Sequence, residues 1–324
     1  MFALRGIAVS FSIFALLYVG LSSLVCVLWR KLLAYGQPYS AKRSADLLFF
    51  ARLAPFAAAS TITLALAVPS FLILEPRAAD EGFSLIPVAL GVCGVSVLLA
   101  GAWKSANALL QASRNIARWS READAESDRG RGSHFPICVR RIAAHAPPLT
   151  AAGIFRPSVW LSRAAEFVLT ERELQSAVRH EVAHVRRRDN LRKLILRFVA
   201  FPGMKQLECA WRELTEMAAD DAAVTSACEA LDLAAAVIKL SRLALPDVPT
   251  ALTTSLVHSP AESVHARVDR LLAWSEGRER SQNTASKYSM ILPMCAAAAA
   301  LFTLAVTYGE LLARVHTATE WLVR

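Results

Sequence analysis

Four long stretches without a charged residue constrain this chain of 324 residues more than any other feature. They cover residues 6–29, 53–74, 83–102 and 289–308. A helix needs about 20 apolar residues to cross the ~30 Å hydrocarbon layer of a membrane, and each stretch reaches that length. Charged residues make up only 19% of the chain and apolar residues 55%, which is too apolar for a fully soluble protein. The sequence therefore predicts an α-helical membrane protein with four transmembrane helices.

Basic residues in the short loops predict the orientation, because cytoplasmic loops are enriched in Lys and Arg. The loop before the second stretch contains Arg30, Lys31, Lys42, Arg43 and Arg52. The loop after it contains one basic residue beside three acidic ones. We therefore expect a multi-pass protein of the inner (cytoplasmic) membrane, with both termini outside and residues 105–288 in the cytoplasm. Basic residues beside the bilayer also explain the net charge of +9, so no direct contact with nucleic acid is expected.

The same pattern predicts the domain organisation. Its three parts are the first three transmembrane helices, one inserted soluble domain, and the fourth helix with a short outer tail: residues 1–104, 105–288 and 289–324. The soluble domain begins with short β-prone runs. One lies at residues 135–140, and residues 148–162 read as two short strands that Gly153 and Pro157 interrupt.

Helical patterns flank and follow these strands. Residues 105–121 predict a helix that leaves the membrane. Thr170 and Glu173 form a capping box, and no Pro or Gly follows until Pro202, which predicts a helix of more than 20 residues from Glu171. Further helices are expected at residues 205–223, 231–245 and 261–274.

The long predicted helix contains the motif His180-Glu181-Val182-Ala183-His184. Residues four apart share a face of a helix, so both imidazoles can reach one metal ion. Two neutral histidines and a carboxylate suit Zn²⁺ with a water in the fourth position. Such an ion lowers the pKa of its water towards 7, and Glu181 is placed to accept the proton. The six cysteines show no CxxC spacing, so a cysteine zinc site is not expected.

A third metal ligand must come from another element. The helix predicted at residues 205–223 offers five acids: Glu208, Glu213, Glu216, Asp220 and Asp221. Glu216 and Asp220 are four apart, so one can bind the metal while the other accepts a hydrogen bond from a ligand imidazole. Glu216 is the first choice for the ligand and Glu213 the second. The alternative interpretation is that all five are solvated surface acids.

The order of these motifs resembles the integral membrane zinc metallopeptidases of the BlaR/MecR type. The matching segments are PLTAAGIFRPSVWLS (148–162), RHEVAHVRRRDN (179–190), ELTEMAADDAA (213–223) and VHARVDRLLA (264–273). The resemblance also covers the arrangement of four spans with a soluble domain between the third and fourth. It implies a cytoplasmic α+β zincin-like metallopeptidase domain.

The resemblance assigns roles to individual residues. His180, His184 and Glu216 correspond to zinc ligands, Glu181 to the general base, and Asp220 to the partner of a ligand histidine. Many family members have Cys-Asp-Glu where this chain has Ala-Asp-Asp at residues 219–221, which leaves these positions intact. No segment matches the family's penicillin-binding sensor, so sensing of β-lactams is not expected.

The sequence thus predicts a membrane zinc endopeptidase that hydrolyses peptide bonds on the cytoplasmic side. By resemblance, it serves regulatory signalling by cutting a cytoplasmic transcriptional repressor, or itself. Two alternatives stay open: a quality-control protease for membrane proteins, and a zinc-binding sensor or scaffold that does not cleave. Besides a protein or peptide substrate and the lipid bilayer, a homo-oligomer is compatible with the sequence.

Overall fold

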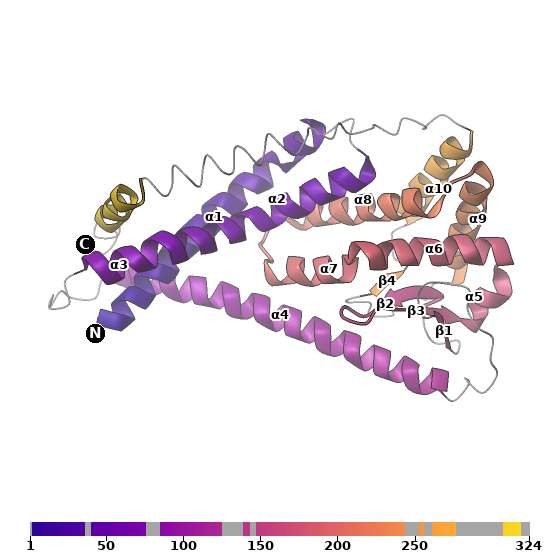
Figure 1. The fold of residues 1–324 in the computed structure, drawn as a ribbon, viewed down its shortest axis with the longest axis horizontal. Helices are drawn as coiled ribbons and strands as arrows, with labels where there is room; N and C mark the ends of the chain where they lie inside the picture. Colours follow the sequence, from indigo (N-terminus) through magenta and orange to yellow (C-terminus); the bar gives the residue numbers. More distant parts are fainter. Residues whose placement is uncertain are drawn as a thin grey trace. The chain divides into compact units, whose positions relative to one another are not determined.

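The computed structural model describes residues 2–35, 40–75, 85–124, 139–142, 147–243, 253–255, 261–276 and 307–318. It is mostly helical with one small sheet (Figure 1). The chain divides into two compact units. The first contains residues 1–35, 50–101 and 283–324, and the second contains residues 36–49 and 102–282.

Three helical segments are long and apolar enough to cross a membrane: Phe2–Ala34, Ala41–Leu74 and Leu85–Ala123. They contain the first two predicted spans and residues 85–102 of the third, so the chain is a membrane protein by length and composition. The predicted fourth span, residues 289–308, lies almost entirely outside the described residues. The helix at residues 307–318 follows it and is part of the first unit.

The first and third of these segments are the helices α1 (Phe2–Tyr35) and α4 (Leu85–Asp124). The second consists of α2 (Ala41–Ile62), the π-helix η1 (Thr63–Ala67) and α3 (Val68–Leu74). Helix α4 runs on without a break through residues 105–121, which confirms the helix that was predicted to leave the membrane. The apolar stretch of the third span ends at residue 102. The helix continues beyond it because no Pro or Gly interrupts residues 105–121.

The second unit also contains a four-stranded sheet and further helices. The strands are β1 (Val139–Ile142), β2 (Leu149–Ala152), β3 (Ser158–Ser162) and β4 (Thr253–Ser255). The helices are α5 (Arg163–Val168), α6 (Glu171–Arg187), α7 (Asp189–Phe198), α8 (Lys205–Ala223), α9 (Ala227–Leu243) and α10 (Ala261–Ser275). The predicted helix at residues 205–223 is confirmed with the same bounds, and β4 was not predicted.

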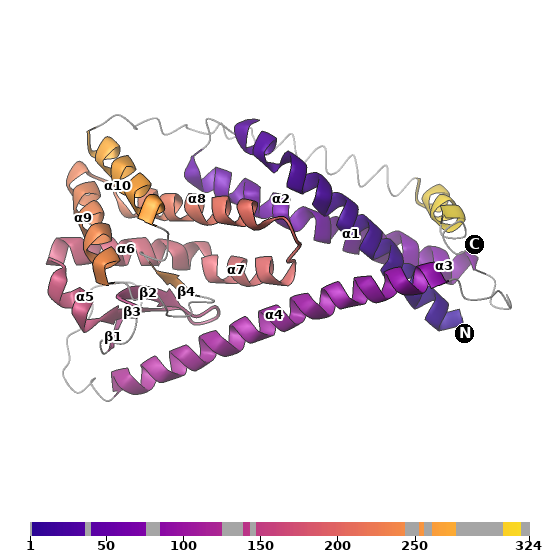
Figure 2. The same ribbon diagram turned by 180° about the vertical axis from the view of Figure 1, so that it is seen from behind.

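The sheet has the order β1-β3-β2-β4, with β1 parallel to β3 and the other pairs antiparallel. Strand β3 is buried on both faces. Val159 and Leu161 join the core formed with α6 and α9, whereas Trp160 packs against Trp119 of α4, with ring centroids 5.8 Å apart. Alternate side chains of a strand point to opposite faces, so helices cover both sides of the sheet. Figure 2 shows the sheet beside α6 in the reverse view.

The long helix predicted from Glu171 is two helices rather than one. The capping box of Thr170 and Glu173 is present, but α6 ends at Arg187 and α7 begins at Asp189. Between them, Arg188 has a left-handed backbone with φ of 55°. The prediction of a single helix was wrong. It relied on the absence of Gly and Pro, but the exposed residue Arg188 adopts the left-handed conformation and breaks the helix without either of them.

Replacing Arg188 by Gly should stabilise the protein. A left-handed backbone costs an ordinary residue roughly 1–2 kcal/mol, and Gly avoids most of this cost. We expect Arg188→Gly to raise the free energy of unfolding by about 1 kcal/mol, which thermal melting of the detergent-solubilised protein would show. The control Gln175→Gly, at an exposed position inside α6, should lower it by about 1 kcal/mol. A lower melting temperature for both variants would contradict the strain assigned to residue 188.

Candidate metal centre

Helix α6 places two imidazoles side by side. His180 and His184 are one helical turn apart, and both side chains are buried, with 0% and 1% of their surface exposed. Their Nε2 atoms lie 3.0 Å from each other. Two buried imidazoles with facing nitrogen atoms need either a shared proton or a cation between them. The motif thus forms a convergent pair of nitrogen ligands.

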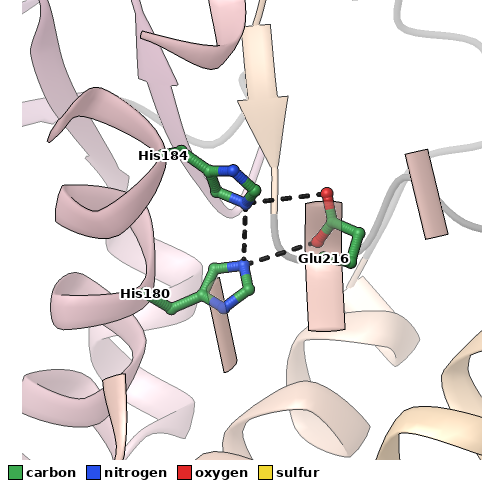
Figure 3. A group of neighbouring side chains, drawn as sticks. All are labelled: His180, His184 and Glu216. Carbon is green, nitrogen blue, oxygen red and sulfur yellow. Dashed lines mark hydrogen bonds and ion pairs between the residues drawn. The ribbon is translucent and has the colours of Figure 1, made fainter. Parts of the chain in front are cut away.

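Glu216 of α8 completes the group. Its Oε2 atom lies 3.4 Å from His180 Nε2, and its Oε1 atom lies 3.6 Å from His184 Nε2. Figure 3 shows the carboxylate facing both rings from the opposite side of the site. One ligand atom from each of the three residues lies within 4.8 Å of the others. Such spacings suit atoms that share one ion at bond lengths of about 2 Å, so the group could bind a metal ion.

The outer nitrogen of each histidine contacts its own carboxylate. His180 Nδ1 lies 2.9 Å from Asp220 Oδ1, and His184 Nδ1 lies 2.7 Å from Asp189 Oδ2. His184 Nδ1 donates a hydrogen bond to Asp189, and the negative charge of Asp220 beside His180 Nδ1 favours a proton on that atom too, so each Nε2 keeps its lone pair for the site. The two aspartates therefore hold both rings in the tautomer that a metal requires.

The left-handed turn at Arg188 explains how Asp189 reaches His184. In a continuous helix, residues five apart point about 140° away from each other, so Asp189 would face away from the imidazole. The break reverses this direction, and Asp189 becomes fully buried against His184. The sequence predicted no role for Asp189.

Arg267 of α10 connects two of the acids. Its Nε and Nη2 atoms donate to the Asp220 carboxylate at 2.8 and 2.7 Å, and Nη1 lies 3.3 Å from Glu216 Oε2. Only 1% of Arg267 is exposed. This paired, planar contact fixes both carboxylates relative to α10. The sequence predicted no role for Arg267.

The electrostatics of the site favour a bound cation. Burial would raise the pKa of Glu216, but His184 and the other charges around it hold that pKa well below its usual value. Burial would lower the pKa of His184, whereas Glu216 and then Asp189 raise it to about 10. Burial likewise opposes ionisation of Asp220, yet Arg267 lowers its pKa to about 2.

Glu181 directly follows the ligand His180 in the sequence, and its side chain contacts the sheet. It is fully buried, and its Oε2 atom accepts a hydrogen bond from the backbone N–H of Ala151 in β2 at 3.0 Å. Asn190 of α7 also contacts this strand and the residue after it. Its Nδ2 atom donates hydrogen bonds to the carbonyls of Ala151 and Gly153, each at 3.2 Å. The carboxylate of Glu181 is thus held between α6 and β2, one residue after His180 and three before His184.

The remaining candidates do not join this cluster. Glu213, the second choice for the third ligand, is exposed on α8. Asp221 forms an ion pair with Arg270 at 2.5 Å, and Glu208 forms one with Arg212. These three acids contribute to the surface of α8 rather than to the metal group. By the helical period Asp221 and Glu208 point to other sides of α8, whereas Glu213 lies on the same side as Glu216 and Asp220 but is exposed.

The hydrogen bond from His184 to Asp189 can be tested directly. Asp189→Asn keeps the shape of the side chain, but its amide no longer stabilises the imidazole through a charge. Removing such a partner typically weakens metal binding 10–100-fold, and we expect a loss of this size. Competition with a fluorescent zinc chelator would measure it, with Glu213→Gln as the control that keeps wild-type affinity. Equal affinities of the two variants would contradict the role given to Asp189.

Comparison with known proteins gives no relative: no protein-family model and no curated protein matches this chain. The site is therefore described by its geometry alone, as a buried His-His-Glu group that could bind a metal ion in a membrane protein.

Proposed function

We propose that this protein is a zinc-dependent endopeptidase anchored in the membrane. One observation carries the proposal: the Nε2 atoms of His180 and His184 and the carboxylate of Glu216 converge, with Glu181 directly beside a ligand on the same helix. Two imidazoles, one carboxylate and an adjacent glutamate form the ligand set and base of zinc peptidases that activate water.

The donor atoms favour zinc over other common ions. Both histidines present an Nε2 lone pair, because the carboxylates of Asp220 and Asp189 beside the Nδ1 atoms favour the tautomer with the proton on Nδ1. Magnesium and calcium prefer sites made of oxygen ligands, whereas imidazole suits zinc and other transition metals. When bound, zinc would polarise a peptide carbonyl and lower the pKa of a water molecule towards 7.

Glu181 then transfers the proton of the attacking water. Glu181 accepts a proton from the attacking water and returns it to the amine that leaves when the C–N bond breaks. Its carboxylate is ready for this role because the N–H of Ala151 fixes one oxygen. Asp189 and Asp220 keep both ligand imidazoles oriented during the reaction, and Arg267 keeps Asp220 and Glu216 in place. The reaction consumes one water and forms a carboxylate and an amine.

Membrane topology and substrate complete the proposal. We infer four spans in the inner membrane and a zincin-like catalytic domain in the cytoplasm, of the BlaR/MecR type. Three candidate spans and the basic first loop support this arrangement. The protein would cleave a cytoplasmic protein in regulatory signalling, such as a transcriptional repressor, or cleave itself.

Substitution of Glu181 tests the chemistry without knowledge of the substrate. Glu181→Gln removes the base but not a metal ligand, so the variant should keep its zinc and lose peptidase activity by about 10²–10⁴-fold. Mass spectrometry of protein N-termini would compare cells that produce the wild type, Glu181→Gln, or the control Glu171→Gln at the exposed start of α6. New N-termini should appear with the wild type and the control only.

Two results would contradict the proposal. New N-termini that persist in a zinc-loaded Glu181→Gln protein would show that another enzyme makes the cuts. A cellular effect of the wild type that Glu181→Gln retains in full, with no new N-termini in either case, would indicate a scaffold that binds zinc without cleaving. A quality-control protease would instead cut many unrelated membrane proteins, which the same measurement would show.

A further inference from the structure

Phe155 of the second unit presents an almost fully exposed aromatic ring. It lies in the loop between β2 and β3, and 91% of its surface is exposed. The residue before it, Ile154, packs in the opposite way, against Ala108 and Ala112 of α4 and Leu194 of α7. A single exposed apolar side chain is common on protein surfaces and carries no argument alone. Its position beside a helix that continues into the membrane is what makes Phe155 informative.

The loop is fastened at both sides of its turn. Gly153 begins the turn with a φ of 102°, a conformation that favours glycine. Asn190 of α7 donates a hydrogen bond to the carbonyl of Gly153 at 3.2 Å, and Ile154 packs on α4. Both ribbon views show the loop extending from the sheet toward the middle of α4 (Figures 1 and 2). Contacts with α4 and α7 therefore determine where the Phe155 ring lies.

Helix α4 sets the distance between this loop and the bilayer. The helix is unbroken from Leu85 to Asp124, and its apolar stretch ends at residue 102. With a rise of about 1.5 Å per residue, Ala108 lies about 9 Å beyond that end. Lipid headgroups extend roughly 5–8 Å beyond the hydrocarbon layer, so a ring beside Ala108 can reach them. Trp103, which is 69% exposed, and the exposed Lys104 are typical of a membrane–water interface at this point of α4.

The three segments that meet at Ile154 carry only positive charges. No Asp or Glu occurs in residues 102–121, 149–162 or 190–207, which we call the basic face. Arg192 of this face is paired with Asp46 of α2, whereas Lys104 and Arg156 are exposed. The cytoplasmic leaflet of a membrane is negatively charged and attracts such a surface. The basic residues of the face are Lys104, Arg114, Arg118, Arg121, Arg156, Arg192, Lys193, Arg197 and Lys205.

We propose that the basic face binds the anionic lipid surface beside α4, with the Phe155 ring among the headgroups and Arg156 and Lys104 at lipid phosphates. A protein could also cover an exposed ring, but the lipid surface is already next to the loop through α4. The same loop follows Ala151, whose N–H binds Glu181. Lipid contact would therefore orient the candidate metal site relative to the bilayer surface. The contact itself does not depend on the proposed peptidase activity.

Photo-crosslinking of the full chain in phosphatidylglycerol nanodiscs tests the contact of the ring. The photoreactive analogue p-benzoylphenylalanine replaces Phe155 in one variant and Phe167 in the control. Phe167 is 94% exposed in α5, which follows the far end of β3, so it matches Phe155 in exposure but not in position. Mass spectrometry should find at least ten-fold more lipid adducts at position 155 than at position 167. Equal yields at the two positions, or no lipid adduct at position 155, would overturn the proposal.

The same measurement tests the lipid charge. With the photoreactive residue at position 155, phosphatidylglycerol should give at least three-fold more adducts than phosphatidylcholine. Arg156→Gln together with Lys104→Gln should reduce this preference by at least half, whereas the control Arg172→Gln, at the exposed start of α6, should keep it. Equal yields from the two lipids would overturn the anionic surface as the partner. Adducts with a protein, or with a second copy of the chain, in place of lipid would overturn the lipid contact.

Discussion

The contacts between two imidazoles and two buried aspartates are the interaction on which the metal group depends. Each aspartate lies against the outer nitrogen atom of one histidine and favours a proton there, and the inner nitrogen atoms face each other at 3.0 Å. A ring with the opposite tautomer would present an N–H to the site and repel a cation. Burying these charges costs free energy of desolvation, and the attraction between opposite charges within the cluster offsets this cost.

Several helices contribute residues to that cluster, so it connects parts of the fold as well as forming the candidate metal site. Helix α6 supplies the histidines and Glu181, α7 supplies Asp189, α8 supplies Glu216 and Asp220, and α10 supplies Arg267. Strand β2 contacts Glu181 and Asn190 through its backbone. The position of any one of these elements therefore affects the geometry of the ligands. A site assembled in this way is preorganised, which zinc binding and catalysis both require.

The sequence was sufficient for the parts of the site that follow a helical period. The spacing of His180 and His184, and that of Glu216 and Asp220, predicted which side chains share a face, and the structure brings these four residues together. It was not sufficient for Asp189 or Arg267. The position of Asp189 depends on the left-handed backbone of Arg188, which no Gly or Pro in the sequence predicts. Arg267 is distant in sequence from the acids that it contacts. Strand β4 was missed because three residues are too short for a periodic signal.

The zinc content of the detergent-purified protein tests the central claim most directly, because it requires neither a substrate nor an activating signal. The wild type should contain about one zinc per chain, and Glu216→Ala should lose most of it, because two histidines alone bind zinc weakly. Circular dichroism would show that the variant remains folded. A well-folded wild type that takes up no zinc, even when zinc is supplied, would contradict the account.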